Sequence, residues 1–141
     1  MTAVLEPQSG AIPLPSPSLR SRPYWEAGAR GELLYQRCPH CGHIPPRPIL
    51  RCGRCAQGEP TWNVSAGTGS LYSWTVVWRP QHPAFTVPYA PAVVSMDEGW
   101  WLMSSMIGCR PDQIEAGMPV RVEFHLAGGD VWLPYVRPAR L

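Results

Sequence analysis

Four of the five cysteines form two Cys-x-x-Cys pairs, Cys38 with Cys41 and Cys52 with Cys55, separated by ten residues. Each pair bends as a tight turn that directs two thiolates toward one point, and two such turns supply the tetrahedral shell of four sulfurs that Zn²⁺ takes in structural sites. A redox Cys-x-x-Cys would need a thioredoxin-like βαβ pattern around it, which the sequence lacks. We therefore predict one structural Zn²⁺ per chain, with no open coordination position for water or substrate.

The rest of the composition favours strands and loops over helices. Proline and glycine together make up 31 of the 141 residues, which excludes a helical bundle, while seven Trp and five Tyr are too many for a disordered chain. No run of 18 apolar residues is present, so we expect no membrane span. The first ten residues lack the basic and apolar regions of a secretory signal, which favours the cytoplasm.

The first 60 residues divide into an arm and a metal-binding module. Residues 1–20 hold four prolines and no periodicity, and they are predicted to form a flexible or extended proline-rich arm. Within residues 21–60 we expect a short helix that begins near Pro23 and ends at Gly31. A strand over 32–37 then leads into the first cysteine pair, and the whole has the outline of a rubredoxin-like zinc ribbon, which needs its metal to hold its shape.

Residues 61–141 have the pattern of a small β-barrel. Short runs of β-branched and aromatic residues recur between glycine turns and predict strands over 62–65, 71–78, 92–96, 101–107, 120–126 and 131–136. One helical turn or tight connection is predicted over 111–117. The expected fold class is therefore mostly β: a short N-terminal helix and a zinc ribbon, followed by a five- to six-stranded OB-fold barrel.

Alternation within two of these strands predicts which side chains share a face. One face of the strand over 71–78 is expected to hold Tyr72, Trp74, Val76 and Trp78. In the strand over 120–126, the side chains expected inside the barrel are Val120, Val122, Phe124 and Leu126.

The aromatic side chains are the strongest indication of a contact surface. A barrel of this size holds three or four of the seven tryptophans at most. Trp100 and Trp101 are adjacent on a predicted strand, so one of them points away from the barrel interior. Exposed aromatic side chains are typical of interfaces, although the ribbon and helix could instead pack over them. The candidate partner- or substrate-contacting residues are Trp25, Trp78, His82, Phe85, Tyr89, Trp100 and Trp101.

No residue of the chain is predicted to be catalytic, because no nucleophile has a base and an orienting group near it in the sequence. His82 lies in a proline-rich loop that borders the binding face of an OB fold, and it is either a contact residue or an ordinary loop residue. Cys109 is interpreted as a small buried hydrophobic residue. His125 alternates outward on its strand and is expected to be solvated.

An OB barrel with stacking aromatic side chains could also bind single-stranded nucleic acid. Such binding needs a positive groove, whereas residues 69–136 carry three arginines against six acidic residues, a net charge of −3. We therefore expect no nucleic-acid partner. Nucleic-acid binding and a free-standing enzyme that acts on CoA thioesters remain as alternatives.

The order of motifs over residues 22–138 resembles the zinc-ribbon/OB-fold proteins formerly called domain of unknown function 35. The resemblance rests on the joint order of the following motifs: Tyr24-Trp25-Glu26, the segment Leu33–Cys38, the two cysteine pairs, the run from Ser65 to Val77, Asp97-Glu98-Gly99, Gly117-Met118-Pro119-Val120 and Leu133-Pro134-Tyr135-x-Arg137-Pro138. Apart from the cysteines, no single motif among these is specific.

This resemblance implies a non-catalytic companion of thiolase-fold acyl-CoA enzymes. Such a companion forms a hetero-oligomer and helps to build or cover the CoA-thioester site, while its partner supplies the nucleophile or base. The favoured partner is the lipid-transfer-protein-like aldolase (retro-aldol C–C cleavage) of steroid side-chain degradation. An acyl-CoA hydratase or an acyltransferase complex remains an alternative. Arg20, Arg22 and Arg30 near the helix could meet CoA phosphates or be solvated surface residues.

Overall fold

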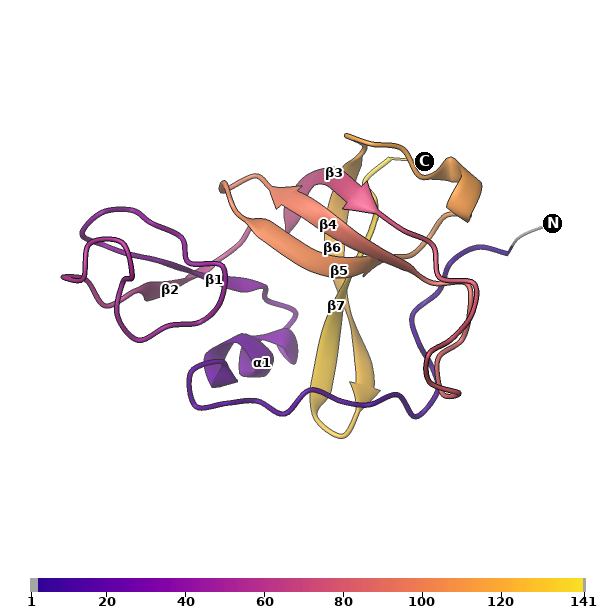
Figure 1. Cartoon of the computed structure of the whole chain (residues 1–141), viewed down its shortest axis with the longest axis horizontal. Helices are drawn as coiled ribbons and strands as arrows, with labels where there is room; N and C mark the ends of the chain where they lie inside the picture. Colours follow the sequence, from indigo (N-terminus) through magenta and orange to yellow (C-terminus); the bar gives the residue numbers. More distant parts are fainter. Residues whose placement is uncertain (1–2, 141) are drawn as a thin grey trace.

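The structure is a computed structural model that describes residues 3–140. It consists of one short helix, a small two-stranded sheet and a closed barrel in the strand order β3-β4-β5-β7-β6 (Figure 1). The elements are α1 (Arg22–Gly28), β1 (Leu34–Arg37), β2 (Thr61–Val64), β3 (Thr68–Trp74), β4 (Ala90–Met96), β5 (Trp101–Met106), a 3-10 turn (Pro111–Gln113), β6 (Pro119–Gly128) and β7 (Val131–Pro138). The predicted fold class, a zinc ribbon followed by an OB-type barrel, is confirmed. None of the helices among residues 3–140 has the length and apolarity that crossing a membrane requires.

Strand β2 belongs to the ribbon sheet and not to the barrel. It pairs antiparallel with β1, from Leu34 opposite Val64 to Arg37 opposite Thr61, and the pair lies to one side of the barrel (Figure 1). β1 leads into the first cysteine turn and β2 leaves the second, so their pairing closes the base of the ribbon. The expectation that this strand begins the barrel was wrong, because the residue pattern predicts a strand but not the strand that it pairs with.

The N-terminal arm packs against the barrel as an extended segment, which is the second of the two forms, flexible or extended, that the sequence left open. The Leu5 side chain is only 2% exposed and lies in the hydrophobic core. Its backbone N–H donates to the Cys109 carbonyl at 2.8 Å, and its carbonyl accepts from the Gly108 N–H at 2.9 Å. Further along, the Gln8 side-chain amide exchanges two hydrogen bonds with the backbone of Thr86. The arm is therefore attached at two points of the barrel domain.

A β-bulge in β3 changes which side chains face the core. The register against β4 shifts between Leu71 and Ser73, so Tyr72 is the extra residue. Leu71 is buried and Trp74 packs against the core, whereas Tyr72 points outward and is 58% exposed. The prediction that Tyr72 and Trp74 share a face was wrong, because the inserted residue reverses the alternation.

Helix α1 packs on the part of the β6–β7 hairpin that extends past the barrel (Figure 1). A Cβ atom on the buried Gly28 would lie 3.2 Å from the Trp132 carbonyl oxygen and 3.3 Å from the Phe124 ring. Val120, near the start of β6, is fully buried in the barrel. Leu126, expected inside, is exposed because that end of the hairpin lies beyond the barrel wall.

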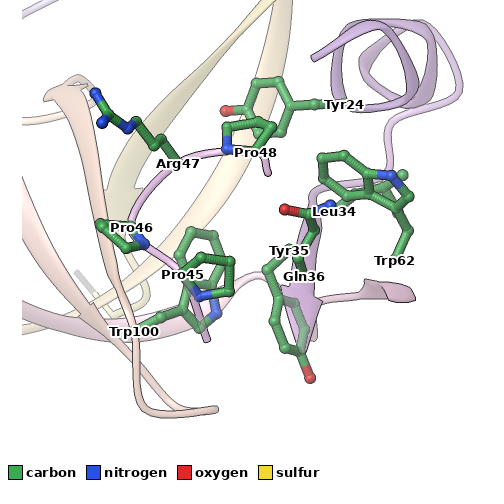
Figure 2. A pocket seen from close by; sticks show the side chains of 10 residues that line it. All are labelled: Tyr24, Leu34, Tyr35, Gln36, Pro45, Pro46, Arg47, Pro48, Trp62 and Trp100. Atoms are coloured by element: carbon green, nitrogen blue, oxygen red, sulfur yellow. The ribbon is translucent and has the colours of Figure 1, made fainter. Parts of the chain in front are cut away.

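The ribbon is attached to the barrel by an aromatic contact. The rings of Tyr35 on β1 and Trp100 before β5 stack with centroids 5.5 Å apart and planes 19° from parallel. Both side chains line a small pocket of about 80 Å³ between the ribbon and the barrel (Figure 2). Pro45 and Pro46, from the ribbon segment between the cysteine pairs, line the same small pocket. The alternative that the ribbon packs over an aromatic side chain therefore describes Trp100.

Candidate functional site

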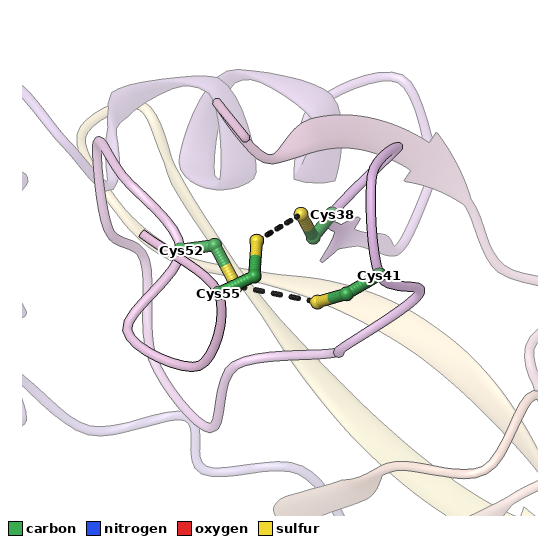
Figure 3. A group of neighbouring side chains, drawn as sticks. All are labelled: Cys38, Cys41, Cys52 and Cys55. Carbon is green, nitrogen blue, oxygen red and sulfur yellow. Dashed lines mark hydrogen bonds between the residues drawn. The ribbon is translucent and has the colours of Figure 1, made fainter. Parts of the chain in front are cut away.

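The four predicted zinc ligands meet at one point of the ribbon. Their Sγ atoms all lie within 4.8 Å of one another. The Cys38–Cys55 sulfurs are 3.7 Å apart and the Cys41–Cys52 sulfurs 3.6 Å apart (Figure 3). A tetrahedral ion with Zn–S bonds of about 2.3 Å places its sulfurs roughly 3.8 Å apart. The donor set and its spacing thus fit a structural Zn²⁺, as the sequence predicts.

Two backbone turns with the same hydrogen-bond pattern position these sulfurs. In the first, the Gly42 N–H donates to the Cys38 carbonyl at 2.8 Å. In the second, the Ala56 N–H donates to the Cys52 carbonyl at 3.0 Å. Gly42 and Ala56 occupy equivalent positions and both have positive φ, +77° and +61°. Left-handed backbone suits glycine better than alanine, so the second turn carries a strain that the first avoids.

The local backbone favours the thiolate form at Cys52 and Cys55. The N–H groups of Cys55 and Arg54 lower the pKa of Cys52 to about 6 despite its burial. The N–H of Gln57 likewise lowers the pKa of Cys55. At Cys41 the His43 N–H also lowers the pKa, but desolvation and the hydrogen bonds with the other cysteines raise it to about 11. The backbone at Gly58 passes so close to Cys38 that a Cβ atom added at Gly58 would overlap the Cys38 sulfur. The zinc site is therefore shaped by backbone N–H donors and by the absence of a side chain at Gly58.

A carboxylate network fixes the junction between the ribbon and the barrel. Glu98, in the turn between β4 and β5, accepts hydrogen bonds from the Ser65 hydroxyl, the Ala66 N–H and the Trp100 indole N–H, all between 2.8 and 3.1 Å. Burial alone would raise the pKa of Glu98, but these donors lower it below its ordinary value. The ionised carboxylate thus ties the segment after β2 to the ring that stacks on the ribbon.

The outer surface of β3, β4 and β5 presents an apolar patch, which we call the outer face and define as Tyr72, Val93, Trp101 and Met103. The Tyr72 and Trp101 rings stack with centroids 4.8 Å apart. Trp101 is 61% exposed and Met103 is 79% exposed. Met103 pairs with Val93 on β4, which extends the patch across the sheet. Of the adjacent tryptophans, Trp101 is therefore the one that points away from the interior.

A second apolar feature, a pocket that we call the hollow, is lined in part by three of the predicted contact residues. Trp25 on α1 and Phe85 and Tyr89 in the loop before β4 line a pocket of about 260 Å³. Its other lining residues are Gln8, Ile12, Tyr24, Met103, Ser104, Ser105, Leu133, Pro134 and Tyr135. They come from the arm, α1, β5 and β7, and no short-range sequence signal could have grouped them.

The remaining candidates lie apart from the hollow's lining. His82 is exposed, its Nδ1 accepts the Ala84 N–H at 3.0 Å, and its ring contacts Phe85 edge to face. Trp78 is exposed in the same loop. His125 is half-buried and lies 2.7 Å from Glu123, which differs from the expected solvated position.

The other two interpretations concern Cys109 and the arginines near the helix. Cys109 is buried, as interpreted from the sequence. Arg20 and Arg22 are exposed, and Arg30 forms an ion pair with Glu32 at 2.9 Å.

Two family models match the chain, one in each part. Residues 25–58 match a model described as the rubredoxin-like zinc ribbon domain of ChsH2. Residues 62–125 match a model described as the C-terminal OB-fold domain of ChsH2. Together they cover the ribbon and most of the barrel.

Curated relatives fall into two groups. The chain is 40% identical over 131 residues to a probable enoyl-CoA hydratase alpha subunit of Thermomonospora curvata, covering 89% of this chain and 40% of that protein. It is 29% identical over 114 residues to the 3-oxo-4,17-pregnadiene-20-carboxyl-CoA hydratase alpha subunit of Mycobacterium tuberculosis, covering 81% and 36%. The chain thus spans about two fifths of the length of these relatives. It is also 31% identical to a DUF35 domain-containing scaffold protein of Methanothermobacter thermautotrophicus, covering 67% of this chain and 73% of that protein.

Solved structures share the fold. A chain of the structure described as "Ltp2-ChsH2(DUF35) aldolase" superposes with a TM-score of 0.83 at 35% identity, covering 90% of this chain and all of that one. A protein of unknown function from the DUF35 family of Sulfolobus solfataricus superposes with a TM-score of 0.59 at 11% identity, covering 86% and 87%. The second likeness concerns the fold alone.

Proposed function

The chain belongs to the DUF35 family of zinc-ribbon/OB-fold proteins, and from this we propose that it is a non-catalytic accessory subunit of a thiolase-fold acyl-CoA enzyme. The observation that carries the proposal is the likeness, at 35% identity, to the whole of a chain from an Ltp2-ChsH2(DUF35) aldolase. The specific enzyme that we propose is a lipid-transfer-protein-like aldolase that cleaves a C–C bond by the retro-aldol reaction in steroid side-chain degradation.

In this proposal the metal and the barrel have separate tasks. Four sulfurs complete the zinc shell, so Zn²⁺ holds the ribbon in shape and supplies no coordination position for a reactant. The ribbon is fixed to the barrel through Tyr35, Trp100 and the Glu98 carboxylate. The outer face and the hollow are then presented on a rigid support, and the partner supplies the reacting groups. We propose that the barrel helps to build or cover the CoA-thioester site of the partner.

A hydratase setting is the second candidate, because the identity of 40% to a hydratase alpha subunit exceeds the identity to the aldolase chain. In that setting this chain would correspond to about two fifths of the larger subunit. Nucleic-acid binding receives less support, since the net charge over residues 69–136 is −3 and phosphate binding needs a positive groove.

Reconstitution with a thiolase-fold partner tests the proposal. The Ltp2-type subunit from the same organism is purified alone and after co-expression with this chain, and retro-aldol cleavage of a hydroxylated steroid side-chain CoA thioester is measured. We expect the chain alone to be inactive and the partner to need the chain for cleavage. Full activity of the partner without the chain would overturn the accessory role. Stimulation of hydration in place of cleavage would favour the hydratase setting.

A further inference from the structure

We infer that the hollow receives one large apolar side chain of the partner subunit, and that Met103 joins this anchor point to the outer face in a single interface. The inference rests on the proposed function, since it takes the partner to be the thiolase-fold subunit. It goes further by naming the contact surface and the chemistry of the group that enters it. Four properties of the hollow carry it: its size, its lining, its preformed walls and its continuity with exposed apolar surface.

The size of the hollow suits a side chain better than a whole ligand. At about 260 Å³ it lies below the roughly 300–1,000 Å³ of sites that enclose drug-sized molecules. A cavity of about 150 Å³ already accommodates benzene, so one aromatic or long aliphatic side chain fits. A steroid nucleus with its CoA thioester does not.

The lining offers apolar contact and no charge. None of the twelve lining residues has an ionisable acidic or basic group of the Asp, Glu, Lys, Arg or His type, in a chain with 22 Arg, Asp and Glu residues. Several of its polar groups are already paired: the Tyr135 hydroxyl accepts the Gln8 N–H at 3.1 Å, and the Ser104 hydroxyl donates to the Pro134 carbonyl at 2.9 Å. A partner group with a charge would lose its hydration without compensation here, whereas an uncharged apolar group matches the walls.

The walls are held in place before any partner binds. The Gln8 amide donates to the Thr86 carbonyl at 2.9 Å and accepts the Thr86 N–H at 2.8 Å, which fixes the arm to the loop that carries Phe85 and Tyr89. The rings of those two residues lie 5.5 Å apart. A preformed pocket avoids part of the entropy cost of ordering loops on association.

Met103 connects the hollow to the outer face. It lines the hollow and stands two residues after Trp101 on β5, so both side chains project from the same side of the sheet. A central pocket that takes an aromatic or aliphatic anchor, surrounded by flatter apolar contacts, is the usual arrangement of an energetically dominant interface region. The uncharged character of both parts points to an uncharged partner surface and away from nucleic acid.

Two substitutions test the hollow and the point where it meets the outer face. Met103→Arg puts a charge at the shared rim, and Ser105→Trp fills the hollow from within. Leu126→Arg is the matched control, because Leu126 is also an exposed apolar strand residue (52%) but lies outside the hollow and the outer face. Each variant is checked for zinc content and melting temperature, and its Kd for the Ltp2-type subunit is measured by titration calorimetry.

We expect Met103→Arg and Ser105→Trp each to weaken binding at least about 30-fold, the loss that corresponds to an interface anchor, and Leu126→Arg to change Kd less than threefold. If Ser105→Trp does not fold, Phe85→Ala removes a wall and takes its place. If Ser105→Trp, or Phe85→Ala in its place, binds the partner with an unchanged Kd, the inference is overturned while the accessory role stands. Binding of the acyl-CoA thioester to the isolated chain, lost in Ser105→Trp, would also overturn it. Failure of the unmodified chain to bind the partner would instead count against the proposed function.

Discussion

The Trp100 indole stacks on the Tyr35 phenol while its N–H donates to Glu98 at 2.9 Å. One side chain thus contacts the ribbon through its ring face and the barrel turn through its ring edge. The distance between the two ring centroids, 5.5 Å, is within the range of favourable aromatic pairs. The ribbon and the barrel are therefore coupled through a contact that is separate from the metal.

Replacing Tyr35 and Trp100 by alanine, singly and together, should reveal this coupling. Aromatic pairs contribute about 0.5–1.5 kcal/mol beyond the area that they bury, so the double-mutant cycle should give a coupling energy in that range. Chemical denaturation followed by circular dichroism measures it. Strictly additive single effects would show that the stack does not couple the two parts.

Glu98→Gln should destabilise the protein by about 1–3 kcal/mol at pH 7, because an amide cannot accept all the donors that the carboxylate satisfies. The pKa of Glu98 is lowered in the folded protein, so its contribution is present above the ordinary value of 4.5 and is lost as the pH falls below it. Melting temperatures of both proteins between pH 7 and pH 3 should therefore converge at the acid end. Glu115→Gln, at an exposed position, is the control. A difference that stays constant over the whole range would contradict the role assigned to the carboxylate.

Gly58→Ala should weaken zinc retention, since its Cβ would overlap the Cys38 sulfur. Gly53→Ala is the matched control, because a Cβ at Gly53 meets no heavy atom within 4 Å. The metal content of each protein after dialysis against increasing chelator concentration provides the measurement. Equal zinc retention by the two variants would show that the close approach at Gly58 does not shape the site.

Leu5→Ala should cost about 2–5 kcal/mol of the free energy of unfolding, as is typical for a buried leucine. Its neighbour Val4 is 51% exposed, and Val4→Ala should change stability by less than about 0.5 kcal/mol. Urea denaturation distinguishes the two. Equal effects would mean that the arm is not part of the folded barrel domain in solution.

The sequence predicted the features that depend on local pattern. The cysteine spacing identified the four sulfurs that the structure brings within 4.8 Å, and Gly31, where the helix was expected to end, has positive φ just after α1. Alternation failed at Tyr72, because a bulge needs only one inserted residue and leaves no compositional signal.

What the sequence could not supply was the pairing of segments that lie far apart along the chain. The pairing of β2 with β1 and the packing of Leu5 both depend on such contacts. The hollow shows the same limit: Trp25, Phe85 and Tyr89 were identified singly, but only the fold shows that they share one pocket with Met103.

The native mass of the chain after co-expression with the Ltp2-type thiolase-fold subunit bears most directly on the accessory role. Size-exclusion chromatography with light scattering should give a single species that contains both proteins, with one zinc per copy of this chain by elemental analysis. Elution of the chain as a separate species at its own mass of 15.6 kDa, or a multiple of it, with the partner fully active alone, would contradict the proposed function.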